Sequence, residues 1–463
     1  MDDKSDQVDN NGVLKMQSFT KRPFSDRDLL KLLIPLIIES LLAVTVGLAD
    51  SMMVAQLGEA AVSSVSIVDT VNVLLINLFG ALATGGAIIT GQYLGARSLE
   101  KAQRYAEQLL LFMAVVSIGV TAAMYLLRST IIYGLFGAVE ADVAANAEAY
   151  FNIVELSIPF LSIYSAGAAL FRVMGDSKTS MKISLYMNLI NVAGNALLIF
   201  VFRWGVAGVA LPTLVSRIYA AVAVLWLLRN PRLTIHLSRN FRFAFERQAV
   251  GQIVRTGVPN GIEGSLFQLG KILLVSVAAQ FGTASITANA IGNTLGSFHC
   301  LPGNSVGMAM ITVISQCVGR GDYDDVRYYT KRLMLYACVS MAVFNTFMIA
   351  ITPAVLDIYN VSAETWDLAW KINFMHAFMC IFIWSFAFTY PQALRAAGDT
   401  RYIMVVSMIS MWVFRLGLGT WLATYGGFGV LGIWMAMFAD WAVRIGCFTA
   451  RWKSGKWETK AVR

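Results

Sequence analysis

The sequence has little charge for its length. Only 14% of its 463 residues are Asp, Glu, Lys or Arg, whereas 57% are hydrophobic, and the mean hydropathy is +0.63. A soluble globular domain carries about 25% charged residues. The shortage of charge argues against a soluble globular protein and predicts a chain that is mostly embedded in lipid.

Metal-ligating and nucleotide-binding patterns are also scarce. The five cysteines form no CxxC pair, and no His or carboxylate cluster completes a metal site in the sequence, so we expect the cysteines to be small packing residues. No Walker A motif is present, so nothing indicates that the chain itself uses ATP, and we expect no cofactor. The first thirty residues are polar, so we expect no cleavable signal peptide.

Long apolar stretches are abundant instead. Twelve segments are apolar and long enough to cross a ~30 Å hydrocarbon layer as helices that rise ~1.5 Å per residue. They are residues 28–56, 60–94, 102–127, 144–173, 179–202, 206–229, 250–281, 285–318, 329–353, 365–394, 402–424 and 429–450. The pattern predicts an all-α integral membrane protein with twelve transmembrane helices.

Positive charge is concentrated between these segments. Of the 36 Lys and Arg residues, 29 lie in the two tails and in the even-numbered connections. Loops rich in Lys and Arg stay in the cytoplasm, so we predict that both termini are cytoplasmic. Because topology accounts for the basic character of the chain, we expect no nucleic-acid partner.

The chain also repeats itself. Residues 35–95 recur without a gap 224 positions later, so that Pro35 and Glu39 return as Pro259 and Glu263. Further pairs are Gln92 with Gln316, Gly95 with Gly319, Arg172 with Arg395, and Gly175 with Gly398. Duplicated membrane units pack against each other, and substrate sites lie between them. We therefore predict two pseudo-symmetric lobes of six helices each.

The predicted domain boundaries follow from the repeat and the charge pattern. They are a cytoplasmic N-terminal tail (1–27), an N-lobe (28–229), a cytoplasmic linker (230–249), a C-lobe (250–450) and a cytoplasmic C-terminal tail (451–463).

Polar residues inside the predicted membrane helices are costly, by a few kcal/mol for a charged side chain, so each needs a reason. Glu39 and Asp50 lie eleven residues apart and share one face of the first helix. Asp69 on the second helix reaches a similar depth, and Asn191 and Asn195 follow a polar stripe on the fifth helix. The Asp50 carboxylate with the oxygens of these amides is a candidate shell for H⁺ or Na⁺. The alternative is that the asparagines only hydrogen-bond neighbouring helices.

The second half differs from the first in its charges. Glu263 occupies the place of Glu39, but the counterpart of Asp50 is Leu274, and Lys271 lies two turns beyond Glu263. We consider Glu263, Lys271, Glu39 and Asp69 as candidates for a second ion or substrate site.

One catalytic pattern occurs. Residues 303–307 fit G-x-S-x-G around Ser305, which in a hydrolase lies on a strand-to-helix elbow. Here the pattern falls within a membrane helix and only His299 is near, so a pair of helix-packing glycines explains it better than an intramembrane hydrolase.

Five stretches carry a resemblance to a known family. They are Pro35–Glu39, Ala49–Gly58, Gly91–Gly95, Leu170–Thr179 and Leu394–Thr400. With them the chain resembles the MATE (multidrug and toxic compound extrusion) family from about residue 28 to residue 450. The resemblance implies twelve helices in two six-helix lobes that form a V, with export driven by the entry of H⁺ or Na⁺.

The resemblance also implies roles for single residues. Asp50 matches the first-helix aspartate of the family's N-lobe cation site, and Pro35 matches the proline at which that helix bends, a hinge. Asn191 and Asn195 match fifth-helix positions of the site, and Thr213 matches its sixth-helix threonine. The chain departs from many relatives in having Asn195 instead of a second aspartate, which leaves one charge for the ion.

A second departure concerns the C-lobe. The aspartate that one branch of the family carries there has no acidic counterpart in this chain, where Phe382 and Ile383 lie nearby. Glu263 is the candidate to replace it.

These observations predict a secondary active multidrug efflux transporter, not an enzyme. It would exchange H⁺ or Na⁺ for amphipathic, cationic small molecules by alternating access. Its partners would be these substrates, the coupling cation and the lipid bilayer, and we expect a monomer in the plasma (inner) membrane. The alternative is a lipid-linked saccharide flippase of the same superfamily architecture, which should expose a markedly cationic cavity.

Overall fold

The computed structural model describes residues 22–135, 140–238 and 243–461. Every regular element in these residues is a helix. The described ranges leave out most of the predicted N-terminal tail and of the segment on which the signal-peptide prediction depends. They also leave out residues 239–242 of the predicted linker and the last two residues of the C-terminal tail.

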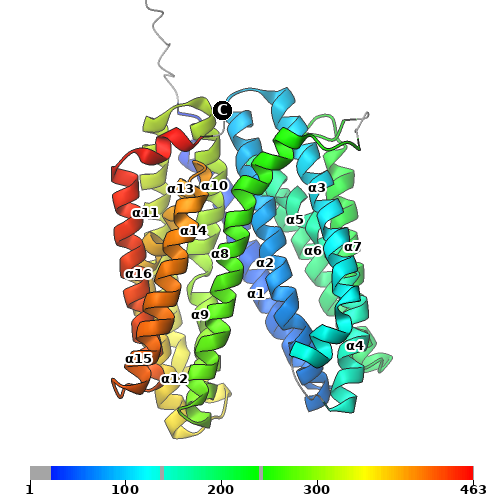
Figure 1. Ribbon diagram of the computed structural model, residues 1–463, viewed down its shortest axis with the longest axis vertical. Coiled ribbons are helices and arrows are strands. Elements are labelled where there is room, and N and C mark those ends of the chain that lie inside the picture. The colour runs from blue at the N-terminus through cyan, green and yellow to red at the C-terminus, as the bar shows by residue number, and fades with distance from the viewer. Residues whose placement is uncertain (1–21, 136–139, 239–242, 462–463) are drawn as a thin grey trace, which may run out of the picture.

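The first half of the chain forms one group of helices (Figure 1). Its α-helices are α1 (Asp26–Ala55), α2 (Glu59–Gly95), α3 (Leu99–Leu126), α4 (Ala141–Glu155), α5 (Ile158–Val173), α6 (Ser177–Ala196) and α7 (Ala207–Leu228). Two short π-helical segments, η1 (Thr130–Leu135) and η2 (Leu197–Val201), follow α3 and α6. A capping box at Ser25 begins α1, because the Ser25 side chain accepts from the backbone of Asp28 and the Asp28 side chain from that of Ser25.

The second half forms the other group. It contains α8 (Arg247–Ala279), α9 (Thr283–His299), α10 (Leu301–Arg320), α11 (Tyr323–Ile358), α12 (Ala363–Met379), η3 (Cys380–Thr389), α13 (Pro391–Ala396), α14 (Thr400–Ile409), η4 (Ser410–Leu418), α15 (Gly419–Thr424) and α16 (Val430–Lys453). A short 3₁₀ turn, η5 (Lys456–Lys460), follows α16 and buries Trp457.

The helices confirm the predicted membrane architecture. In the described residues, eleven helices are long and apolar enough to cross a membrane, and the bent pair of α4 and α5, at 43°, raises the number to twelve. Eleven of the twelve predicted segments coincide with one of these spans or with the bent pair. The remaining segment, 285–318, is divided into α9 and α10, of which only α10 is by itself long and apolar enough to cross. A proline lies in the first turn of the helix that follows each of these two breaks, Pro159 in α5 and Pro302 in α10. Proline lacks the N–H that would continue the preceding helix, so a new helix starts there.

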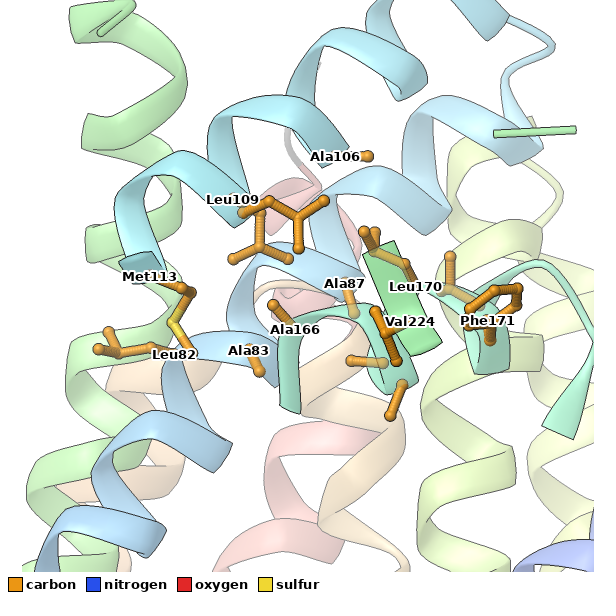
Figure 2. Close-up of a cluster of buried hydrophobic side chains, with 14 of the residues drawn as sticks. Leu82, Ala83, Ala87, Ala106, Leu109, Met113, Ala166, Leu170, Phe171 and Val224 are labelled. Atoms are coloured by element: carbon orange, nitrogen blue, oxygen red, sulfur yellow. The ribbon is translucent and has the colours of Figure 1, made fainter. Parts of the chain in front are cut away.

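Small residues let the helices of the N-lobe pack closely. Gly86 on α2 lies directly against the Leu109 side chain of α3, and Gly167 on α5 lies against Val224 of α7. Figure 2 shows the buried cluster that results, in which α2, α3, α5 and α7 contribute Leu82, Ala83, Ala87, Ala106, Leu109, Met113, Ala166, Leu170, Phe171 and Val224. In lipid no hydrophobic effect drives helices together, so close packing of this kind holds them in contact.

The two lobes meet most extensively along α2 and α8. At this contact Gly85 faces the backbone of Gly257, where an added Cβ would come 2.5 Å from the Gly257 Cα. Figure 1 shows the lobes in contact at the end near the C-terminus and apart at the opposite end, as the two arms of a V. The end at which the lobes meet also carries the basic connection after α2 and the C-terminal tail, and we call it the basic end.

The repeat produces a pair of equivalent contacts at the basic end. The Gln92 side chain of the N-lobe donates to the Ala396 carbonyl of the C-lobe at 2.8 Å, and Gln316 donates in the opposite direction to the Val173 carbonyl at 2.7 Å. Gly95 packs on the Gln316 backbone and Gly319 packs on the Gln92 backbone. Two related lobes therefore contact each other through the same residues of each repeat.

Candidate functional site

Asp50 lies half-buried between three helices of the N-lobe. The Asn195 amide of α6 donates to Asp50 Oδ1 at 2.8 Å. In the orientation of the Asn191 amide that satisfies both its N and its O, the nitrogen donates to both Asp50 oxygens at 3.0 Å. The Asn191 oxygen then accepts from the Thr213 hydroxyl of α7, also at 3.0 Å. The four residues predicted for the coupling-ion site are therefore brought together.

The local sequence explains this placement. Asn191 and Asn195 are one helical turn apart, so both face α1, and their exposed fractions are 7% and 0%. Between them, Gly194 packs against Pro212 of α7, with an added Cβ only 2.7 Å from the proline ring. Because Gly194 has no side chain, α7 can approach α6 closely. Thr213, the residue after Pro212, then reaches Asn191.

The amides point differently from what the sequence suggested. We expected amide oxygens to line the site, whereas both asparagines turn amide nitrogens towards Asp50. That arrangement suits an ionised carboxylate, which only accepts hydrogen bonds. The Asn195 oxygen is buried and has no hydrogen-bond partner among the described residues. Na⁺ prefers oxygen ligands, so rotation of the two amides would present carboxylate, amide and hydroxyl oxygens that fit this ion.

Asp69 extends the acidic region of the N-lobe. Its carboxylate on α2 accepts a hydrogen bond of 3.2 Å from the Tyr150 hydroxyl of α4, and it is close enough to Asp50 for the two groups to interact electrostatically. Tyr150 is thus a residue of this region that sequence reasoning missed.

Glu155 is a second residue that sequence reasoning missed. It ends α4, is fully buried, and neither of its carboxylate oxygens has a hydrogen-bond partner in the described part of the chain. Arg217 on α7 interacts with Glu155 electrostatically but donates its hydrogen bond to the Ser157 hydroxyl at 2.6 Å. The signal that could have found Glu155 is an acidic residue inside a predicted membrane segment.

Glu39 and Glu263 form equivalent ion pairs in the two lobes. Glu39 binds Arg172 of α5 at 3.2 Å and accepts from Ser180 of α6 at 3.0 Å. Glu263 binds Arg395 of α13 at 2.5 Å. Both arginines lie inside helices and are mostly buried. The structure therefore places both glutamates away from Asp50, each with a cation of its own lobe.

Lys271 lies in a separate cavity of about 390 Å³. The cavity is lined by C-lobe residues and by Val44 of α1, so it lies where the two lobes face each other. Arg415 of η4 lines the same cavity. Lys271 is one of the residues that the sequence predicted for a second ion or substrate site.

Next to this cavity the fold assembles cysteine and histidine side chains. Ligand atoms of Cys300, His376 and Cys380 all lie within 4.8 Å of one another, and His299 Nδ1 is 2.8 Å from His376 Nδ1. The sequence did not predict this cluster, because only His376 and Cys380 are close in the chain. Soft ligands of this kind suit Zn²⁺ or Cu(I), but the cations Lys271 and Arg415 on the same cavity oppose a bound metal cation.

Ser305 has no catalytic partners among the described residues. Its hydroxyl is fully buried and bonds to the Leu301 carbonyl and the Ser40 hydroxyl, both at 3.0 Å. His299, the base that the pattern would need, bonds to His376 instead. These contacts are those of a helix-packing serine.

Two related helical lobes in a membrane, with a polar carboxylate site inside one and a cavity between them, are the architecture of a secondary transporter. A sequence profile of the MatE family matches residues 35–197 and again residues 259–421. Position 259 is 224 after 35, and 421 is 224 after 197, so the family's unit occurs once in each half. The chain belongs to the MatE family, whose members are transporters and not enzymes.

Known proteins are similar to this chain over nearly its whole length. The uncharacterized transporter YisQ of Bacillus subtilis is 25% identical over 97% of this chain and 99% of its own length. The probable multidrug resistance protein NorM of Thermotoga maritima is 23% identical over 94% of each chain. A solved structure described as the outward-facing conformation of a multidrug resistance MATE family transporter of the MOP superfamily matches with a TM-score of 0.87. At 18% identity over 93% of this chain and 96% of the other, that match shows the fold.

Proposed function

We propose that the chain is a multidrug efflux transporter that exchanges a cation, H⁺ or Na⁺, for amphipathic, cationic small molecules by alternating access. The family supports transport, and relatives such as NorM of Thermotoga maritima are named as probable multidrug resistance proteins. The observation that supports coupling to a cation is the Asp50 carboxylate, which accepts hydrogen bonds from α6 inside the N-lobe.

Asp50 would couple the ion to the conformation through its hydrogen bonds. Ionised, it accepts from Asn191 and Asn195 and so ties α1 to α6. Protonation or Na⁺ binding neutralises the Asp50 carboxylate and so weakens its hydrogen bonds from the two amides. The α1–α6 contact must then rearrange, with Pro35 as the hinge of α1. The ion drives transport only if it binds one of the two states more tightly than the other.

The direction of exchange follows from the orientation. We propose that the basic end and both termini are cytoplasmic, in accord with the Lys and Arg in the connections. The lobes meet at the basic end, so the described state would be open to the outside. A cation from outside would then reach Asp50, and the neighbouring Asp69 carboxylate would favour a cation there. We propose a monomer as the working unit in the plasma (inner) membrane.

Dye efflux from vesicles under an imposed pH or Na⁺ gradient tests the proposal. We expect Asp50→Asn to abolish most gradient-driven efflux while the protein remains in the membrane at the wild-type amount. Asp142→Asn, an exposed acid in the first turn of α4, is the matched control and should leave efflux unchanged. The gradient that supports efflux identifies the ion. Wild-type efflux by Asp50→Asn under both gradients would refute the assignment.

A lipid-linked saccharide flippase is the second candidate, since Lys271 and Arg415 line a cavity between the lobes. Flipping of a fluorescent lipid pyrophosphate by the protein in vesicles, without dye efflux, would favour this candidate.

A further inference from the structure

Lys271 and Arg415 are cations without a counter-charge. Both lie within membrane spans and line the same cavity, and no Asp or Glu is among the described residues that line it. Arg415 Nε is buried and has no hydrogen-bond partner in the described part of the chain. Asp440, the acid that interacts electrostatically with Arg415, is already paired with Arg444 at 2.8 Å. Ionisable groups at membrane depth are costly, and two neighbouring cations without an acid point to a ligand that supplies the negative charge.

The rest of the cavity fits an aromatic, amphipathic molecule. Its walls carry five aromatic rings, of Phe267, Trp384, Phe388, Trp434 and Trp441. The Arg415 guanidinium lies 5.2 Å from the centre of the Phe267 ring, so this ring holds the cation at the wall by a cation–π contact. A volume of about 390 Å³ is within the range of small-molecule sites.

In the repeat, the two cations lie on the C-lobe helices that correspond to the N-lobe helices of the Asp50 site. The repeat offset is 223 or 224 in this part of the chain, so Arg415 lies within one position of the counterpart of Asn191. Leu274, one turn after Lys271, is the counterpart of Asp50. The N-lobe thus uses its first and fifth helices to build an acidic site. The C-lobe uses the same two helices of its own repeat to build a basic one.

We propose that this cavity binds the anionic group of an amphipathic organic substrate, a carboxylate, sulfonate or phosphate attached to an aromatic body. Lys271 and Arg415 bind the anion, and the five aromatic rings hold the apolar body. The inference rests on the proposed efflux function and refines its substrate class. With Asp50 and Asp69 in the other lobe, the transporter would accept anions and zwitterions as well as cations.

Three probes with one aromatic body test the site. The full-length protein in nanodiscs of phosphatidylcholine is titrated calorimetrically with 1-naphthalenesulfonate, 1-naphthalenemethanol and 1-naphthylmethylammonium, which are anionic, neutral and cationic. We expect the sulfonate to bind on the order of tenfold more tightly than the alcohol, because charge-assisted hydrogen bonds are roughly twice as strong as neutral ones. Lys271→Met and Arg415→Met should each remove most of this preference. Lys271→Glu should shift the preference towards the ammonium.

Lys331→Met is the control, because it removes an exposed cation from α11 that does not line the cavity. It should leave sulfonate binding unchanged. A second measurement does not depend on any ligand. Each cavity cation lies within a membrane span without an ion pair among the described residues, so Lys271→Met and Arg415→Met should unfold at a temperature equal to or above that of the wild type. Equal affinity of the wild type for the three probes, or wild-type sulfonate binding by both cavity variants, would overturn the proposal.

A lipid headgroup could supply the same anion. In nanodiscs that contain phosphatidylglycerol, weaker sulfonate binding by the wild type would identify the lipid as an occupant of the site, and unchanged binding would identify a soluble anion. Asp50→Asn should bind the sulfonate as the wild type does. Loss of coupling and loss of anion binding are therefore observed in different variants, and either proposal can fail without the other.

Discussion

Replacing Gly95 by alanine should force the two lobes apart at the basic end. An added Cβ on Gly95 would overlap the Gln316 carbonyl of the other lobe, and the same holds for Gly319 and the Gln92 carbonyl. Both positions adjoin the glutamine hydrogen bonds that join the lobes, at 2.7 and 2.8 Å. Carbonyl and helix backbone cannot rotate away as a flexible side chain can, so the helices themselves must separate.

The size of the effect follows from packing. Overpacking a well-packed contact costs about 1–3 kcal/mol. This cost applies only to the state in which the lobes touch at the basic end, so it should shift the equilibrium between the two states by about 5-fold to 150-fold. Gly95→Ala and Gly319→Ala should have similar effects, because the repeat places the two glycines in equivalent contacts.

Distances across the opposite end report the shift. Spin labels at Glu59→Cys and Thr283→Cys, in a cysteine-free background, lie on exposed and repeat-related positions at the start of α2 and α9. Double electron–electron resonance should show a long distance in the parent protein. The Gly95→Ala variant should gain a shorter distance as this end closes.

Gly119→Ala on α3 is the matched control, since an added Cβ there meets nothing within 4 Å. It should leave the distances unchanged. If Gly95→Ala and Gly319→Ala kept the parent distance distribution and the parent unfolding temperature, the close contact between the lobes would not control their separation.

Two further predictions concern the buried ion pairs. Arg172→Met leaves Glu39 mostly buried without its cation, so it should lower the free energy of unfolding by about 1–3 kcal/mol, measured by thermal unfolding in detergent. Adding Glu39→Gln to this variant should restore most of the loss. The repeat-related Arg395→Met should behave alike, and an unchanged unfolding temperature would show that the pair contributes nothing. Arg444→Met leaves Asp440 fully buried and uncompensated, so we expect a loss of about 3–5 kcal/mol in the same assay, and a loss below about 1 kcal/mol would contradict it.

Much of the architecture could be predicted from the sequence. All twelve apolar segments are helical, and eleven of them match a membrane span or the bent pair, because a chain in lipid must satisfy its backbone hydrogen bonds locally and has no alternative to the helix there. The gapless repeat predicted two related lobes, and the family profile found the same offset. The grouping of Asn191 with Asn195 was also predictable, because residues one turn apart share a face of their helix, and the family resemblance supplied Asp50 as their partner.

Partners far apart in the chain were decided only by the tertiary structure. Glu39 with Arg172, Lys271 with Arg415, and Cys300 with His376 each join separate helices. Helical periodicity gives the face on which a side chain lies but not the neighbour that packs against that face. That neighbour depends on the rotation and crossing of whole helices, which small residues such as Gly85 and Gly194 set through close contacts. The sequence by itself therefore determined the number of apolar segments, their duplication and the polar stripe of Asn191 and Asn195. Helix packing decided which charges are paired and which face the cavity.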